Sequence, residues 1–455
     1  MTRPVRFFVV WIGVGLAFRL GGLPFWGTFD TEVQKAWSAR AATGGLADIY
    51  GPSDRELIAA ARARGGSVAW QLLTMPFPRT VFKWGTADYF VDYPPGSVLV
   101  LWAAGKLYAA LTPDLPNRRA FNGAINLAPL LASLAITFLL RRSAEGGVGQ
   151  LRALLFWLNP AVYLAAPVLG YQDPIFAALA LAAVMALMGG RHVAAASLVV
   201  ASALVKPQGA LLLPVLLVVL LREARPRDWL RAALGSVATA AVILLPWWSR
   251  GHLLSTLDGF RRPLSQGTLA PLGLNVWWIA GYAMQWARQG PFPLAEIVAI
   301  EPFRAWAGID PRVVSRLLLG TAILVSLWFQ LRAPREDRRM IPLTVILQVH
   351  AYALFGTSVH ENHTFLAVVL APLLLGVWPQ AVRLLATTSA FLFASLYLAA
   401  GFGRRITTLS SLEDLRMATR FDLTVLVALG HVALFAVIVV WVARTSSGRL
   451  RSVAP

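Results

Sequence analysis

The chain contains no cysteine, which excludes disulfide bonds and thiolate metal sites. It is also poor in charge: 14% of its 455 residues are charged, whereas 57% are hydrophobic. This balance is typical of a chain that crosses a membrane many times. We find no tandem repeat, no low-complexity tract and no stretch with the composition of a soluble domain. The sequence therefore predicts a single all-α integral membrane domain over residues 1–455.

Acidic residues are scarce: 22 Asp and Glu stand against 41 Lys and Arg, for a formal net charge of +19. In a soluble protein this excess would suggest nucleic acid as a partner. Here the basic residues lie mostly in short loops between apolar runs, as the positive-inside rule expects of cytoplasmic loops, so we expect membrane lipid and no nucleic acid. The first apolar run contains Arg19 and has no small-x-small cleavage site, which predicts a retained anchor. The excess of arginine over lysine is typical of a GC-rich bacterial genome.

About twelve apolar stretches (11–13) have the length and composition of membrane spans. They lie near residues 6–23, 120–140, 151–168, 173–189, 192–206, 208–222, 229–248, 314–332, 340–358, 363–379, 382–400 and 423–443. A further apolar run, 94–111, decides the orientation of everything after it. If this run crosses, the later basic clusters lie outside, against the positive-inside rule. We therefore expect 94–111 to be an amphipathic or re-entrant helix, with both chain termini in the cytoplasm.

This topology divides the chain into four parts. They are a large first outer loop with in-plane amphipathic helices, a helical module, a second outer loop and the C-terminal helices, at residues 24–119, 120–248, 249–312 and 313–455. Within the first loop we expect a Gly-rich turn at Thr43–Gly45 and a charged helical piece from Ser53 to Arg64.

The polar groups that are hardest to explain as solvated loop all fall on the outer face. They are Asp30 and Asp92 in the first loop, Gln172 and Asp173 in a tight turn, Lys206 and Gln208 around Pro207, and His360 and Glu361 in another short turn. An ionisable group held near a membrane face is a functional candidate. Carboxylates, a lysine and a histidine at one mouth of a helical bundle therefore predict a site.

Structural alternatives exist for three of these groups. Asp30 could cap a helix over Glu32–Arg40, because Asp is a preferred N-cap residue. Asp173 could cap the helix that the following proline begins. Lys206 could simply extend its ammonium group to water.

Two further motifs also have alternative interpretations. His360 and His363, with Glu361 between them, could indicate a metal site. Two histidines without the longer helical zinc signature are, however, weak evidence for a metal site. We therefore expect no required cofactor and keep a divalent metal as the lesser alternative. The Tyr93–Pro95 segment could be only a rigid turn, since proline fixes the backbone and begins helices well.

The motifs occur in a definite order. They are a first-loop aspartate, Asp92-Tyr93-Pro94-Pro95-Gly96, Asn159-Pro160 before Gly170-Tyr171-Gln172-Asp173, Lys206-Pro207-Gln208, Leu274-Asn275-Val276-Trp277-Trp278 and Val359-His360-Glu361-Asn362. This ordered set resembles the GT-C superfamily of polyprenyl-phosphate-sugar-dependent glycosyltransferases, over about residues 8–370, and is most similar to its mannosyl- and glucosyltransferase-like members. The chain departs from the usual Trp-Gly-Gln-x-Asp pattern before Asp173. It also has Asn362 where family members often carry a basic residue.

The resemblance implies inverting transfer of one sugar, such as mannose or glucose, from a polyprenyl monophosphate to a lipid, glycan or protein acceptor. Asp30 matches the family's catalytic base, and a carboxylate at a low-dielectric boundary can take the proton of an acceptor hydroxyl. The leaving phosphate needs positive charge and hydrogen-bond donors, for which the candidates are Lys206, His360, Arg118 and Arg119. The candidate sugar- or acceptor-binding residues are Asp92, Tyr93, Gln172, Asp173, Gln208, Asn275, Trp277 and Glu361. Of these, Gln172 and Asp173 would orient either sugar hydroxyls or Lys206.

Two other classes of membrane protein remain open. A transporter or flippase would also need intramembrane charge and broken helices, but we find no inverted repeat, and the polar residues gather at one mouth rather than at the midplane. A lipid-linked glycan ligase or polymerase would take its glycan from a diphosphate, and the sequence does not separate this from a monophosphate donor. A non-catalytic scaffold is a further alternative. We expect the protein in the cytoplasmic (inner) membrane, with the site on its outer face.

Overall fold

The chain is helical nearly throughout in the computed structural model, which describes residues 3–25, 27–50, 81–84, 87–257, 260, 267–401 and 422–447. The first half contains α1 (Arg3–Gly22), α2 (Phe29–Gly44), η1 (Ala47–Tyr50), α5 (Pro95–Leu111), α6 (Arg119–Arg142), α7 (Gly146–Trp157), α8 (Pro160–Tyr163), η2 (Leu164–Val168), α9 (Asp173–Met188), α10 (His192–Val205), η3 (Pro207–Leu212), α11 (Leu213–Glu223) and α12 (Pro226–Trp248). The second half contains η4 (Leu254–Leu257), α14 (Val276–Gln289), α15 (Ile300–Ala307), α16 (Pro311–Arg332), α17 (Met340–Phe355), α18 (Phe365–Leu370), η5 (Ala371–Leu374), α19 (Ala381–Ala400) and α21 (Leu423–Ser446). Two short strands, β1 (Val81–Trp84) and β2 (Ala87–Phe90), pair antiparallel within the first outer loop.

Each of the twelve predicted apolar stretches contains a helix, but the helices differ in length. Among the described residues five helices are long and apolar enough to cross a membrane: α6, α12, α16, α19 and α21. The segments α7 and α8–η2 form a sixth candidate, with a bend of 46° between them. Several others are shorter, and the 16 residues of α9 rise only about 24 Å, less than the hydrocarbon core of a typical bilayer. The count of twelve crossings therefore stays a prediction.

The bend between α7 and α8 has an identifiable cause. Asn159 ends the helical hydrogen-bond pattern because its Oδ1 accepts the Ala161 N–H at 2.9 Å, as an N-cap in front of Pro160. The Trp157 carbonyl finds a partner outside its own helix, because Arg19 of α1 donates to it at 2.7 Å. The Arg19 guanidinium also lies over the Trp157 ring, 4.2 Å from its centroid. These contacts explain the buried arginine in the first apolar run.

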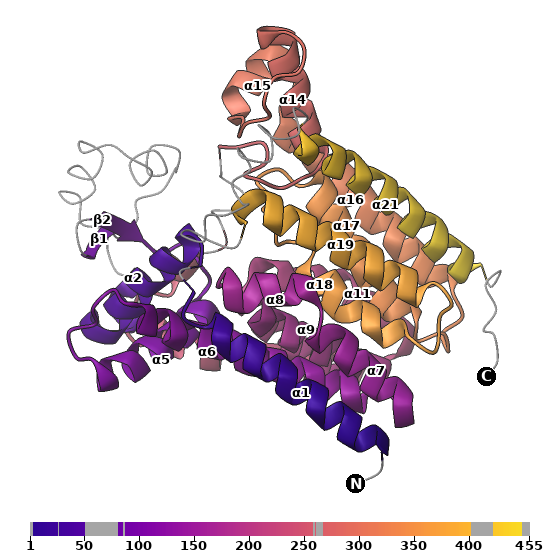
Figure 1. Cartoon of the computed structure of the whole chain (residues 1–455). Helices are drawn as coiled ribbons and strands as arrows, with labels where there is room; N and C mark the ends of the chain where they lie inside the picture. The colour runs from indigo at the N-terminus through magenta and orange to yellow at the C-terminus, as the bar shows by residue number, and fades with distance from the viewer. Residues whose placement is uncertain are drawn as a thin grey trace.

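Two helices of the segment 24–119, α2 and α5, pack against each other at one end of the bundle (Figure 1). The α2 helix covers the predicted helix at Glu32–Arg40, and α5 covers the predicted run 94–111. Ser38 Oγ of α2 donates to the Leu101 carbonyl of α5 at 2.6 Å. The predicted charged piece at Ser53–Arg64 lies outside the described residues.

The opposite end of the bundle collects arginines. Arg222, near the end of α11, donates to the carbonyls of Gln330 and Ala333 at 2.5 and 2.8 Å. Next to it, Glu223 accepts two bonds from Arg338 at 2.6 and 2.7 Å. These contacts join basic clusters that belong to separate loops of the sequence.

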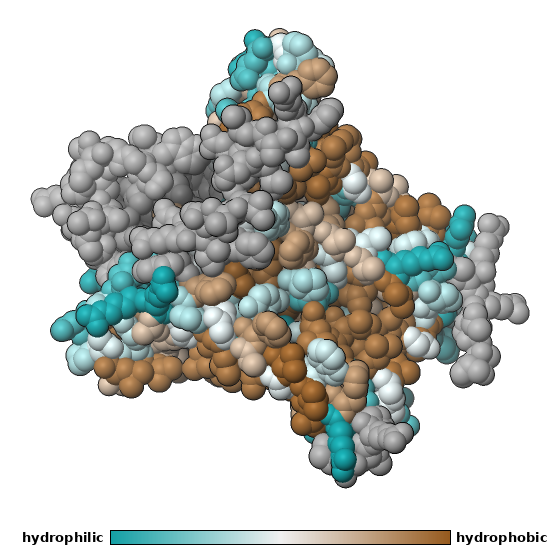
Figure 2. All heavy atoms as spheres, viewed as in Figure 1, coloured by the Kyte–Doolittle hydropathy of each residue, from teal (hydrophilic) through white to brown (hydrophobic). Residues whose placement is uncertain are grey.

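The flank of the bundle is apolar and faces outward. Leu230, Val237 and Val242 of α12 are 62%, 66% and 73% exposed, and Leu317 and Leu324 of α16 are 67% and 69% exposed. Figure 2 shows hydrophobic side chains over much of the flank, with strongly hydrophilic ones toward the ends of the molecule. Long helices with such side chains on the outside are stable when lipid surrounds them. The chain is therefore a helical membrane protein.

Candidate functional site

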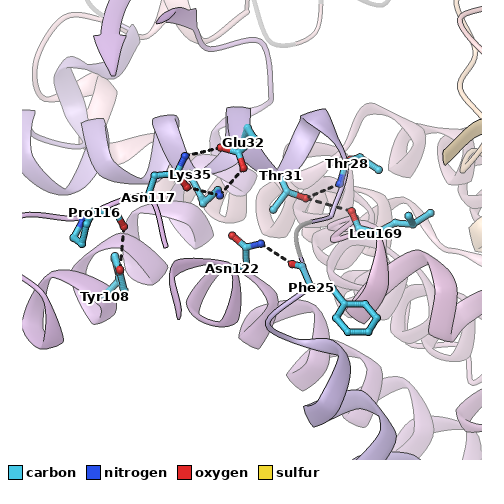
Figure 3. Close-up of polar contacts among 10 residues, drawn as sticks. All are labelled: Phe25, Thr28, Thr31, Glu32, Lys35, Tyr108, Pro116, Asn117, Asn122 and Leu169. Carbon is cyan, nitrogen blue, oxygen red and sulfur yellow. Dashed lines mark hydrogen bonds and ion pairs between the residues drawn. The ribbon is translucent and has the colours of Figure 1, made fainter. Parts of the chain in front are cut away.

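Asp30 is the second residue of α2, and its side chain is half-buried. Thr28 is the N-cap: its backbone is extended (φ −99°, ψ −174°), and its N–H donates to Thr31 Oγ1 at 3.3 Å (Figure 3). The alternative in which Asp30 caps this helix is therefore wrong, because the helix starts one residue before it. A carboxylate in the first turn is still stabilised by the partial positive charge of the helix N-terminus.

The start of α2 is docked on the turn before α9. The Thr28 N–H and Thr31 Oγ1 both donate to the Leu169 carbonyl, at 3.2 and 3.3 Å (Figure 3). Gly170 follows with φ +76°, and a Cβ added there would lie 2.5 Å from Thr31 Oγ1. Both the backbone conformation and the close approach therefore require glycine at this position.

The same face of α2 continues toward α9. One helical turn after Asp30, the side chain of Gln34 is buried and accepts a hydrogen bond from Gln172 at 3.2 Å. Because positions four residues apart share a helix face, Asp30 lies on the side of α2 that faces this turn.

A buried lysine fixes α2 from another side. Lys35 is 0% exposed, and its Nζ lies 2.7 Å from both Glu32 Oε1 and Asn117 Oδ1 (Figure 3). The Asn117 amide in turn donates to Glu32 Oε2 at 2.8 Å, which closes a ring of three bonds between α2 and the turn before α6. The position of α2, and with it the position of Asp30, is therefore set by contacts on two sides.

An ion pair joins the turns that carry Asp173 and Lys206. Lys206 Nζ lies 2.8 Å from Asp173 Oδ1, and Asp173 Oδ2 accepts a bond from Asn362 Nδ2 at 2.8 Å. Gln172 is the N-cap residue of α9, whereas the Asp173 carboxylate binds these two side chains. Lys206 is only 7% exposed, so its ammonium does not extend to water. Both structural alternatives, the Asp173 cap and the solvated lysine, are therefore wrong.

The position of Lys206 depends on the break between α10 and η3, where its backbone is extended (φ −146°). The start of α5 packs on this break. Ser97 Oγ donates to the Val205 carbonyl at 2.7 Å, and a Cβ added to Gly96 would lie 2.7 Å from the Leu204 carbonyl oxygen. The start of α5 therefore packs against the segment that carries Lys206.

Glu361 is a second buried carboxyl group at this place. Its Oε1 accepts a hydrogen bond from the Tyr171 hydroxyl. Its Oε2 has no hydrogen-bond partner among the described residues and lies 3.9 Å from His360 Nδ1. Burial raises the pKa of Glu361 to about 7; the Asp30 carboxylate also raises this pKa, and the Tyr171 bond opposes the rise. Glu361 thus exchanges its proton near neutral pH.

Tyr93 connects the first loop to the same cluster. Burial raises the pKa of Tyr93 well above its ordinary value of 10, and the carboxylates of Asp30, Asp173 and Glu361 raise it further. Three carboxylates from different segments therefore act on one phenol. Asp92, the residue before Tyr93, is also buried.

Gln208 and two histidines flank the cluster. Gln208 Nε2 lies 2.9 Å from His363 Nε2, and the His363 ring stacks on Tyr352 with 5.4 Å between centroids. His363 Nδ1 accepts the backbone N–H of His360 at 3.3 Å, while the His360 side chain is 41% exposed. Within the described ranges, no set of three or more His, Asp or Glu side chains is arranged to hold a metal ion.

Asn275 and Trp277 lie in a different packing environment. Asn275 Oδ1 accepts the N–H groups of Trp277 and Trp278 at 3.0 and 3.1 Å, as the N-cap of α14. Its amide donates to two carbonyls at the end of α17, one of them Gly356, at 3.2 and 3.0 Å. These residues hold α14 against the segment that leads to Glu361, and a role in sugar binding stays a prediction.

Arg118 and Arg119 are exposed at the start of α6. They follow Asn117, whose bonds go to Glu32 and Lys35 of α2. The structure therefore places them beside the lysine contact of α2, and their role as phosphate ligands stays a prediction.

The cluster includes residues outside the set expected from the sequence. Tyr171, Gln34 and Asn362 each bond a member of the predicted site. Gln34 follows Asp30 at helical spacing, which is a usable signal. Tyr171 and Asn362 belong to two of the quoted motifs, but their hydrogen-bond partners are far away in sequence, so no local pattern indicates these contacts.

Three carboxyl groups lie close together in the cluster. Asp173 pairs with Lys206, and Asp30 and Asp173 both act with Glu361 on Tyr93. The charge of Asp30 also disfavours the charged form of Glu361. Such surroundings favour proton uptake by a carboxyl group. The site can thus accept a proton from a hydroxyl group and bind a polar substrate at the end of an apolar bundle.

Comparison of the sequence with protein-family models and with curated proteins gives no match. The function therefore rests on the chemistry of this cluster.

Proposed function

We propose that the protein is an inverting glycosyltransferase with a GT-C-like fold in the bacterial cytoplasmic membrane. It would move one hexose from a polyprenyl monophosphate to a lipid, glycan or protein acceptor. The observation that carries this proposal is the meeting of Asp30, the Asp173–Lys206 pair and Glu361 at one end of an apolar helical bundle. A prenyl-linked sugar needs both parts of this arrangement, a polar site for its head and an apolar surface for its tail.

Asp30 is the general base in this proposal. The acceptor hydroxyl attacks the anomeric carbon, its proton passes to the Asp30 carboxylate, and the bond from carbon to the phosphate oxygen breaks. A single displacement of this kind inverts the anomeric centre. The contacts of α2 with Leu169, Gln172 and Asn117 fix the base, and fixed geometry is a large part of its catalytic value.

Lys206 stabilises the leaving phosphate. Its ammonium has three donors, and one of them lies on Asp173. The phosphate gains a negative charge as the bond breaks, and a cation in a buried site stabilises such a charge strongly. His360, with its partly exposed ring, is the second candidate for this contact.

The arrangement of charged residues supports the proposed orientation. Arg338 comes just before the start of α17, whereas Glu361 of the site follows its end. The Glu223–Arg338 pair, with Arg222 beside it, therefore lies at the end of α17 away from the site. By the positive-inside rule the arginine end is cytoplasmic and the site faces outward. Twelve crossings with both termini inside agree with this orientation.

Asp30→Asn tests the proposal directly. We expect transfer of labelled hexose from prenyl-phosphate mannose or glucose to membrane acceptors to fall by about 10²–10⁴-fold, the usual contribution of a general base. The matched control is Asp48→Asn, the same change at an exposed aspartate of the same loop, which should keep wild-type transfer. Near-wild-type turnover by Asp30→Asn, at an equal amount of folded protein, would contradict the role of the base.

A further inference from the structure

Glu361 has no role in the transfer as proposed so far, although it lies inside the site. Its side chain is buried at 7% exposure, and Tyr171 bonds its Oε1. Its Oε2 has no hydrogen-bond partner among the described residues, although a buried carboxylate oxygen normally has one. The Oε2 atom is therefore available for a hydrogen bond with a bound ligand.

The groups around Glu361 come from several segments among the described residues. They are Asp30 in α2, Tyr93 before α5, Tyr171 and Asp173 at α9, Lys206 after α10, and His360 and His363 in its own turn. Asp30 disfavours the charged form of Glu361, and Lys206, the cation that favours it, is already paired with Asp173. A further anion in this site would make the charged form less favourable still.

We propose that Glu361 binds the prenyl phosphate in its protonated form, taking up one proton on binding and donating a hydrogen bond from Oε2 to a phosphate oxygen. The inference rests on the proposed function of the site. It explains how a site that contains Glu361 accepts a phosphate, because the carboxylic acid is a neutral donor whereas its carboxylate would repel the phosphate.

The proton count of the reaction agrees with this role. The donor is a phosphodiester with one negative charge, and the released prenyl phosphate is a monoester with up to two. During transfer Asp30 receives the acceptor proton and becomes neutral, while the phosphate gains one charge. Glu361 keeps its proton throughout and shares it with the phosphate oxygen, so the total charge of the site does not change.

Binding of farnesyl phosphate to the whole protein in lipid nanodiscs tests the inference. Calorimetry in buffers with different ionisation enthalpies should show about one proton more taken up by wild type than by Glu361→Gln above pH 7. The Kd of the wild type divided by the Kd of Glu361→Gln should rise about tenfold for each pH unit above the pKa of Glu361. The reason is that the wild type must first take up a proton, whereas the amide of the variant is always neutral. The phosphate group of farnesyl phosphate also titrates, but it does so in the same way with both proteins and therefore cancels in the ratio of the Kd values.

Tyr171→Phe provides a second, independent readout. The Tyr171 bond favours the charged carboxylate, so its loss should raise the pKa of Glu361 and move the fall in affinity to higher pH. Equal pH dependence of binding in wild type, Glu361→Gln and Tyr171→Phe would overturn the inference and leave the proposed transferase intact. Failure of wild type to bind farnesyl phosphate at any pH would overturn both.

Discussion

Lys206 and Asp173 have both lost most of their water in the folded protein, so each depends on the other. Asp173→Asn removes the carboxylate that pairs directly with a buried ammonium, and we expect it to lower the free energy of unfolding by about 3–5 kcal/mol. In Asp173→Asn/Lys206→Met neither charge remains, so thermal unfolding in detergent should show much of the stability restored. The double variant should nevertheless fail to bind a prenyl phosphate. A double variant as unstable as the single one would show that the pair is not the source of the loss.

Glu361 should also make the stability of the protein depend on pH. Its pKa is raised from an ordinary value of 4.5 to about 7, so folding favours the protonated form. The stabilisation is complete below pH 4.5 and is lost as the pH rises through 7, by roughly 3 kcal/mol for a shift of this size. Between pH 5 and 8, chemical unfolding should therefore show wild type losing stability relative to Glu361→Gln. Parallel pH profiles would contradict the assignment.

At the scale of elements, the docking of α2 on the turn before α9 decides where the proposed base lies. Gly170→Ala places a methyl group against Thr31 Oγ1 at a positive φ, and we expect a loss of about 1–3 kcal/mol together with a loss of transfer. Gly13→Ala in α1 is the matched control, because no atom lies within 4 Å of the added Cβ. Thermal unfolding and transfer should remain at wild-type level in the control. Normal transfer by Gly170→Ala would show that the docking does not position Asp30.

The elements near the site also show what a sequence can predict. The α2 and α5 helices follow from local patterns, since α5 is an apolar run that begins at Pro95. Asn275 was expected in the site, although an Asn before an apolar run is equally an N-cap signal, and it caps α14. The sequence predicted that Asp173 and Lys206 would share one face of the membrane, with the orientation of Lys206 as one of two roles for Asp173. Their direct contact depends on which helices become neighbours, which no local pattern encodes.

For the whole molecule, the site constrains how the chain crosses the membrane. Asp30 and Asp173 act on the same Tyr93 ring, so they lie at the same end of the bundle. The chain must therefore cross an even number of times between them. If α6 and the bent α7–η2 segment, both candidate spans, make one crossing and one return, a crossing by α5 would make the number over the described segments odd. Together with its packing on α2, this favours an α5 that lies along the outer face.

Single cysteines test this topology cleanly, because the native chain contains no cysteine. Thr43→Cys before α5 and Asp114→Cys after it are at exposed positions and should both react with a membrane-impermeant maleimide added to intact cells. Glu145→Cys, between α6 and α7, should react only after the membrane is permeabilised. If Thr43→Cys reacts and Asp114→Cys is protected, α5 crosses, Asp30 and Asp173 lie on opposite faces, and the site cannot form. Labelling of both together with protection of Glu145→Cys leaves the first loop and the α9 turn on one face, as a base that acts beside Lys206 requires.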